Sequence, residues 1–350
     1  MTNSGTSIAA ALFSALLFGA STPLAKILAI DIPPVLLAGF LYLGSGIGLW
    51  TIRLIRDRRL GVPKLPAGDW AWFLCAIVAG GLIGPVLLMV GLTQTSGSSA
   101  SLLLNLEAVL TSLIAWIVFR ENADRRLVLG MALIVAGGAV LVWPQGNDAP
   151  ATIRGALFIA GACLCWGIDN NLTRKVAAAD ADFIAGTKGL AAGATNLVLA
   201  LTWGAHMPSA AVISVAMTIG LLGYGVSLVL FILALRGLGS ARAGAYFSTA
   251  PFLGAATALL VLHEPTPAGF WLSSLLMAAG VALHLTERHA HEHGHEALTH
   301  AHPHVHDAHH QHQHDFPWDG TEPHVHEHRH GILTHEHAHF PDLHHRHGHS

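Results

Sequence analysis

Two groups of side chains in this 350-residue chain have types and spacings suited to chemistry. The first is a set of histidines: 23 of the 26 lie in the last 64 residues, and many alternate with one other residue. Alternate residues share one face of an extended chain, and neutral imidazole is a good ligand for Ni²⁺, Co²⁺, Zn²⁺ and Cu²⁺. The pattern therefore predicts a site for a divalent transition metal. Its affinities would follow the Irving–Williams order, so the tail does not select its own metal.

The histidine-rich segment is duplicated. Residues 289–314 align without gaps on 324–349, and 15 of the 26 aligned positions are identical. A pH-responsive polar tail and a low-complexity expansion are alternative interpretations of the same pattern. Because residues 287–350 have almost nothing apolar to bury, we expect them to be disordered. The predicted metal ligands are His291, His293, His295, His300, His302 and His304 in the first copy, and His326, His328, His330, His335, His337 and His339 in the second.

The second group consists of ionisable side chains inside long apolar segments, where a buried charge is costly and a functional role is the default hypothesis. Glu107 falls near the middle of its segment, two residues from Asn105. We expect it to bind a cationic group or carry a coupling proton, or else to accept a structural hydrogen bond. Lys26 falls near the outer end of its segment, where it either neutralises a substrate carboxylate or extends to the lipid headgroups.

Asp169 and Lys188 both fall in the inner half of their segments, estimated from the helical rise per residue. They can therefore pair, either as a gate at the inner mouth or as a purely structural salt bridge. We expect Asn171, Trp166 and Tyr246 to line the same cavity, with Asn170 and Asn196 as additional candidates.

The elements that must position these groups are long apolar segments. A typical soluble domain has about a quarter of its residues charged, whereas this chain has 11%, which excludes a single soluble domain for residues 1–286. About 20 apolar residues span a bilayer, and this length predicts an all-α integral membrane protein with ten transmembrane helices. They cover approximately residues 7–30, 33–54, 69–93, 97–119, 126–143, 153–174, 182–204, 209–235, 240–262 and 267–286.

Basic residues in the short connections predict the orientation. One alternating set of connections holds twelve Lys and Arg residues and the other holds only Arg154. Cytoplasmic loops carry the excess of basic residues, so we expect a multi-pass protein of the cell's inner (plasma) membrane with both termini, and hence the histidine-rich tail, in the cytoplasm.

The membrane part contains an internal repeat. Residues 90–142 align without gaps on 233–285, a shift of 143, and the Glu121/Glu264 pair is its most telling match. Each half then has five spans, and an odd number requires the second half to be inverted. Inverted repeats are typical of secondary transporters, whose substrate site lies near the bilayer midplane. The predicted parts are residues 1–144 and 150–286 as the two repeats and 287–350 as the tail.

Several segments resemble the drug/metabolite transporter superfamily, EamA type. They are Leu104–Val109 with Phe119-Arg120-Glu121 in the first half, Ala245–Phe252 with Leu262-His263-Glu264 in the second, and Phe18–Pro23 in the first span. The resemblance covers about 280 residues and implies a ten-helix alternating-access carrier, of a family thought mostly to export metabolites, amino acids or drugs. It does not identify the substrate.

Three functions are consistent with these features. The first is an exporter of a small metabolite or amino acid with a metal-binding tail, the second an exporter of Ni²⁺, Co²⁺ or Zn²⁺, and the third a membrane-anchored metal buffer. The sequence contains no nucleophile elbow, Walker motif or HExxH, so we expect no enzyme and no required cofactor. A divalent transition metal, Ni²⁺, Co²⁺, Zn²⁺ or Cu²⁺, is expected on the tail. The expected partners are the lipid bilayer and a small-molecule or ion substrate, with no nucleic acid. A homodimer is compatible with the sequence.

Overall fold

The structure of the protein is a computed structural model. It describes residues 4–57, 68–119, 125–143, 149–173, 181–238 and 240–285, together with four strands in the tail. These residues divide into two compact units, Met1–Glu287 and Arg288–Ser350, here called the body and the tail.

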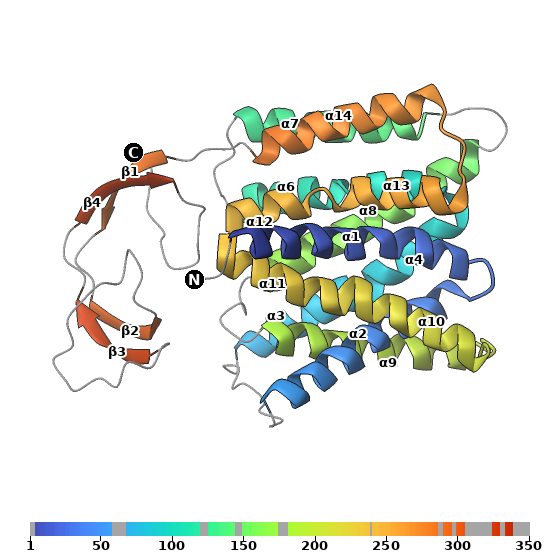
Figure 1. Ribbon diagram of the computed structural model, residues 1–350, viewed down its shortest axis with the longest axis horizontal. Coiled ribbons are helices and arrows are strands. Elements are labelled where there is room, and N and C mark those ends of the chain that lie inside the picture. The colour runs from blue at the N-terminus through green and yellow to red at the C-terminus, as the bar shows by residue number, and fades with distance from the viewer. Residues whose placement is uncertain are drawn as a thin grey trace. The chain divides into compact units, whose positions relative to one another are not determined.

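All regular elements in the described residues of the body are helices (Figure 1). Its first-half helices are α1 (Ser4–Leu28), α2 (Pro34–Asp57), α3 (Asp69–Ala76), the π-helix η1 (Ile77–Ile83), α4 (Gly84–Gln94), α5 (Gly97–Leu103), α6 (Leu106–Val118) and α7 (Arg125–Leu141). Its second-half helices are α8 (Ala149–Thr173), α9 (Ala181–Thr202), α10 (Ala210–Gly220), the π-helix η3 (Leu221–Val226), α11 (Ser227–Leu238), α12 (Ser240–Phe247), α13 (Ala250–Leu262) and α14 (Ala268–Leu285).

Nine helical segments among the described residues are long and apolar enough to cross a membrane. Some of these segments combine several helices: α3, η1 and α4 form the span Asp69–Gln94, and α5 and α6 form Gly97–Val118. The segment α7 has 17 residues, at the lower limit of what spans a bilayer, and it occupies the fifth predicted position. The predicted all-α membrane fold is confirmed, because each predicted span coincides with a helical segment.

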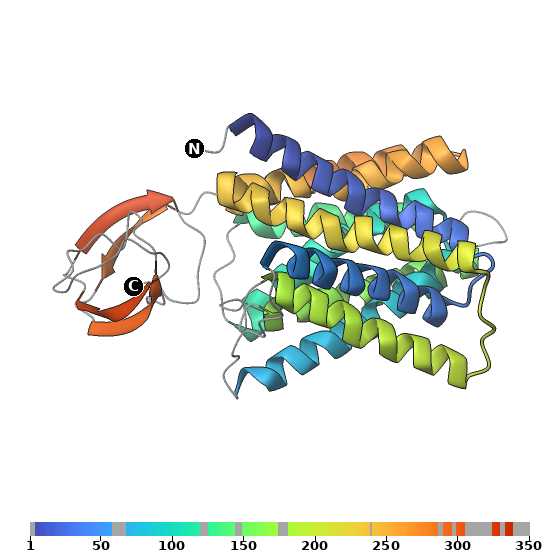
Figure 2. The same ribbon diagram turned by 60° about the horizontal axis from the view of Figure 1, so that its bottom comes forward.

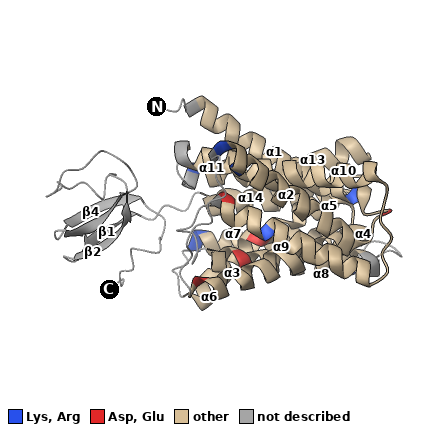
Figure 3. Cartoon of the chain, turned by 90° about the horizontal axis from the view of Figure 1, so that it is seen from below, with Lys and Arg blue, Asp and Glu red and all other residues tan. Residues whose placement is uncertain are grey.

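Charged side chains are sparse in the body (Figure 3), while large apolar side chains lie on its surface, among them Leu260 and Leu275 at 76% and 68% exposure. An outward-facing apolar surface is what helices in lipid present, since the hydrocarbon does not need to be excluded.

The two halves share the positions of their irregularities. The π-helices η1 and η3 lie in corresponding spans, and the interruptions of helix at Leu104-Asn105 and Ser248-Thr249 do so too. Each pair follows the 143-residue shift of the repeat to within one residue. Interrupted helices at corresponding places in two halves mark the substrate region of inverted-repeat transporters.

Helices of the first half pack directly against helices of the second half. α1 lies against α11 and α13, α2 against α9, and α7 against α14 (Figures 1 and 2). Small residues permit these contacts: a Cβ added to Gly19 on α1 would lie 2.2 Å from the Ala250 carbonyl oxygen at the start of α13. The body is therefore one unit although its sequence has two repeats.

The tail differs from the expected disorder. Its described residues form β1 (Ala290–His295), β2 (Thr299–His304), β3 (His324–Arg329) and β4 (Leu333–Ala338). β1 pairs with β4 and β2 with β3, both antiparallel. Alternation with a period of two, which the sequence has in its His-x-His runs, is the pattern of a strand, and the duplication supplies each strand with a partner.

Candidate functional site

Glu107 lies at the centre of the span Gly97–Val118, in the first turn of α6. The helix is interrupted just before it, where the amides of Leu104, Asn105 and Glu107 bond to carbonyls three residues back instead of four. The Asn105 side chain donates to the Leu102 carbonyl at 2.8 Å, so this carbonyl accepts from both the side chain and the amide of Asn105. A carboxylate is stabilised at this position because a helix N-terminus carries partial positive charge.

The neighbouring helix α8 provides the partners of Glu107. Asn170 donates from Nδ2 to Glu107 Oε1 at 3.0 Å and lies 3.3 Å from the Thr111 hydroxyl. Asn171, which is buried, donates to the backbone carbonyls of Thr111 and Gly167 at 3.1 and 2.8 Å. Glu107 and Thr111 lie on one face of α6 because they are four residues apart. Asn171 therefore anchors α8 to α6, whereas Asn170 contacts the carboxylate itself.

Asp169 and Lys188 form the ion pair that their depth predicts. Lys188 Nζ lies 2.6 and 2.7 Å from the two carboxylate oxygens of Asp169, and the two side chains are 16% and 9% exposed respectively. The Thr173 hydroxyl also donates to Asp169, at 2.9 Å. The pair joins α8 to α9.

The π-helix η1 also packs against α8, next to the residues described above. The amide of Gly84 bonds to the Ala79 carbonyl five residues back, and the next such donor would be Pro85, which has no N–H. The Gly80 carbonyl is thereby left for side chains, and both Trp166 Nε1 and the Tyr42 hydroxyl donate to it at 3.0 Å. The ring of Tyr42 in turn lies 5.7 Å from the ring of Tyr224 in η3, so the two π-helices meet through this aromatic pair.

Six of the eight predicted site residues thus lie on two adjoining helices or directly beside them. We call Glu107, Asn170, Asp169, Lys188 and Trp166 the central polar group. Asn105 and Asn171 support its backbone.

The other two predicted residues lie elsewhere. Lys26 donates to the Leu92 carbonyl at 2.6 Å, at the end of α4. Tyr246 packs against a small cluster around Ala11, Ala234 and Ala243. Ten of the twelve predicted metal ligands in the tail lie in the strands, and the other two, His330 and His339, lie outside the described residues.

A carboxylate beyond the central polar group closes one end of the bundle. α13 ends at Leu262 and its cap His263 is left-handed, with φ of 52°. Glu264 then accepts from the amides of Gly97 and Ser98 at 2.6 and 2.8 Å and from the Ser98 hydroxyl at 2.5 Å. The second repeat therefore caps the helix N-terminus of the first, which the sequence did not predict although it singled out Glu264 in the repeat.

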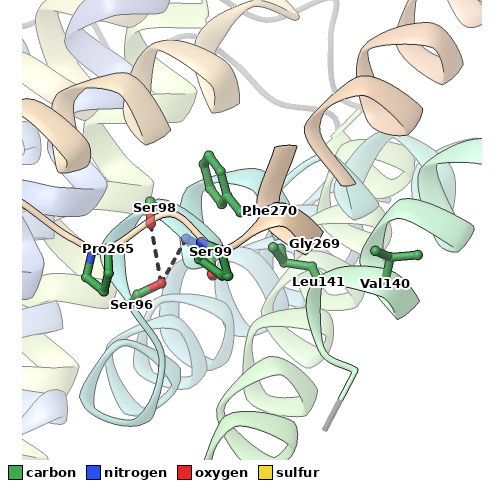
Figure 4. A pocket seen from close by; sticks show the side chains of 9 residues that line it. Ser96, Ser98, Ser99, Val140, Leu141, Pro265, Gly269 and Phe270 are labelled. Atoms are coloured by element: carbon green, nitrogen blue, oxygen red, sulfur yellow. Dashed lines mark hydrogen bonds between the residues drawn. The ribbon is translucent and has the colours of Figure 1, made fainter. Parts of the chain in front are cut away.

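A cavity of about 230 Å³ opens beside this cap (Figure 4). Its lining includes Ser96, Ser98, Pro265 and Phe270. The Ser96 hydroxyl accepts from the Ser99 amide at 3.1 Å and lies 3.4 Å from the Ser98 hydroxyl. These hydroxyls complete the cap of α5, so the cavity is a feature of the bundle end and not of the central polar group.

Sequence reasoning missed Thr111, Thr173, Tyr42 and the Gly80 carbonyl. The spacing of four residues between Glu107 and Thr111, and between Asp169 and Thr173, was a signal for the two threonines. The role of Gly80 depends on a π-helix and on a proline five residues later, and no period in the sequence marks it.

Comparison with known proteins agrees with this architecture. The model of the EamA-like transporter family matches residues 5–143 and again 153–286. An "uncharacterized transporter" of Methanothermobacter thermautotrophicus (strain ATCC 29096 / DSM 1053 / JCM 10044 / NBRC 100330 / Delta H) is 27% identical over 280 residues, which cover 75% of this chain and 81% of that protein. A solved structure described as "Crystal structure of protein" superposes with a TM-score of 0.60 at 20% identity, covering 79% of this chain and 95% of the other, and shares the fold.

Proposed function

This chain belongs to the EamA-like transporter family and is a membrane transporter. From that premise we propose that it is a secondary active exporter of a small metabolite or amino acid. The observation that carries the proposal is Glu107, a carboxylate at mid-membrane depth beside an interrupted helix, hydrogen-bonded to Asn170 on the adjoining span. Groups of this kind mark substrate or ion pathways in membrane proteins.

Charge indicates the class of substrate. Lys188 is bound to both oxygens of Asp169, so it does not neutralise Glu107. The central polar group then carries a net negative charge when both carboxylates are ionised. It is therefore suited to a substrate with an ammonium group, or to a proton that neutralises Glu107 during the cycle. Asn170 and Thr111 supply hydrogen-bonding groups for the polar remainder of such a substrate.

The direction and setting are part of the proposal. Export is the direction that the family resemblance implies, and the excess of Lys and Arg in alternate connections supports an inner-membrane protein with cytoplasmic termini. We further propose that the tail binds Ni²⁺, Co²⁺, Zn²⁺ or Cu²⁺ through its histidines.

Metal export would need several ligands together in the body. Within the described ranges no group of three or more His, Cys, Asp or Glu side chains could hold a metal ion, and we do not propose it.

Efflux profiling tests this function. Cells overproducing the full chain are loaded with a panel of amino acids and amines, and with Ni²⁺, Co²⁺ and Zn²⁺, and the loss of each compound is followed. We expect Glu107→Gln to lower the efflux rate of the transported compound at least about tenfold, since a hydrogen bond to a charged group contributes about 1.5–3 kcal/mol.

Asp182→Asn is the matched control, because Asp182 pairs with the half-exposed Arg56 away from the central polar group. It removes the same charge and should leave efflux nearly unchanged. Normal efflux by Glu107→Gln would refute the assignment of the site. Efflux of a metal ion alone would refute the proposed substrate class.

A further inference from the structure

The pairing of the tail strands joins the two copies of the histidine repeat. β1 and β2 belong to the first copy, whereas β3 and β4 belong to the second. Under the 35-residue shift of the duplication β1 corresponds to β3 and β2 to β4, yet β1 pairs with β4 and β2 with β3. Each ladder therefore contains one strand from each copy, and neither copy forms a ladder by itself in the described residues.

The register places histidine opposite histidine. In the β1–β4 ladder His291 is opposite His337 and His293 is opposite His335. In the β2–β3 ladder the opposed positions are His300 and His328, His302 and His326, and His304 and His324. A shift of the register by one residue would end this matching, because every histidine would then face a residue of another type.

Alternate positions of a strand share a face, and directly opposed positions lie on the same face of a ladder. The β1–β4 ladder thus has five histidine positions on one face, namely the two opposed pairs and His295, which is opposite Leu333, and the β2–β3 ladder has six. Opposed positions have Cβ atoms about 4.5–5.5 Å apart. That separation suits ligands of a single ion, whose bonds to imidazole nitrogen are about 2.0–2.1 Å long for zinc.

Without bound metal, like charges at opposed positions destabilise this pairing of the strands. Opposed like charges destabilise a strand pair, so protonated histidines facing each other oppose pairing. Glu292 is also opposite Glu336 on the other face. A divalent cation bound to neutral imidazoles reverses the balance on the histidine face, because binding and ladder formation are then coupled.

We propose that the tail binds divalent transition metal at shared sites, one on each ladder, with ligands from both copies of the repeat at each site. The first site uses His291, His293, His335 and His337, and the second draws on the six histidine positions of β2 and β3. The duplication would then exist to complete each site rather than to double the number of independent ones. This inference rests on the metal-binding part of the proposed function.

A double-mutant cycle on the full-length chain in detergent tests the sharing, with Zn²⁺ alone as the probe and a competing chelator. The variants are His291→Ala/His293→Ala in the first copy, His335→Ala/His337→Ala in the second, and all four together. We expect each pair to weaken one site roughly 100-fold, because even loss of a second-shell partner costs roughly 10- to 100-fold in affinity. The quadruple variant should lose nothing further, since the site is already absent.

His312→Ala/His314→Ala is the control, because it removes the same number of histidines from the first copy at positions outside the described strands. It should leave both tight sites in place. Additive losses in the cycle, or an equal loss in the control, would overturn shared sites while leaving a metal-binding tail intact. Absence of tight Zn²⁺ binding to the unaltered chain would overturn both this inference and the proposed metal-binding tail.

Discussion

At the scale of single residues, Asp169 and Lys188 show how the membrane changes the energetics of a charge pair. Breaking a buried pair by removing one partner costs about 3–5 kcal/mol, because the other charge stays buried without compensation. We therefore expect Asp169→Asn and Lys188→Met each to lower the stability of the body by about that amount, measured by thermal unfolding in detergent. The double variant should recover much of the loss.

The Arg56–Asp182 pair is the comparison within the same molecule. Its partners are 50% and 12% exposed, and exposed pairs contribute about 0–1 kcal/mol, so Asp182→Asn should change stability little. Equal effects at the two pairs, or a double variant as unstable as the sum of the two single ones, would show that Asp169 and Lys188 do not depend on each other.

At the scale of helices, Gly80 in the π-helix η1 packs so closely against Asp169 in α8 that there is no room for a side chain at position 80. A Cβ on Gly80 would lie 2.0 Å from Asp169 Oδ2, so Gly80→Ala must displace the carboxylate or the helix. We expect a loss of about 1–3 kcal/mol, the usual cost of overpacking, visible as a lower unfolding temperature.

Gly244 in α12 is a matched control for this substitution, because a Cβ there meets nothing within 4 Å. Gly244→Ala removes the low helix propensity of glycine and should stabilise by up to about 1 kcal/mol. A loss of stability with Gly244→Ala as large as that with Gly80→Ala would mean that the contact with Asp169 does not set the cost.

The same elements show what the sequence could predict. Length and apolarity were sufficient for the helical spans, and depth was sufficient for the Asp169–Lys188 pair. Composition alone predicted a disordered tail, because it does not register that one copy of a repeat can pair with the other. The Glu264 cap and the hydrogen bonds from Trp166 and Tyr42 to the Gly80 carbonyl join segments far apart in the chain. A single sequence has no local signal for such contacts.

At the scale of the whole molecule, the departures from α-helix recur at corresponding positions of the two repeats. η1 and η3, and the interruptions before α6 and α13, place backbone that departs from the α-helix at corresponding positions of each repeat. Such backbone is tolerated in a membrane where it is buried in protein or lines a polar cavity. Glu107 lies at the interruption of the first repeat, and Ala250 begins the helix after the interruption of the second. The two halves are therefore alike in backbone and different in chemistry, since the carboxylate of Glu107 has no counterpart at the corresponding position, Ala250.

The inverted arrangement also fixes which ends share a side of the membrane, and this can be measured. Ten predicted spans, an even number, would place both termini on one side of the membrane, and the basic connections predict that this side is the cytoplasm. A fluorescent protein fused after Ser350 should therefore be fluorescent, and alkaline phosphatase at the same point inactive. The phosphatase inserted at Gly204, in the connection between α9 and α10, should be active, because that connection lies on the opposite side. Active phosphatase at Ser350 would reverse the orientation and put the histidine repeats outside the cell, where they would not meet cytoplasmic metal.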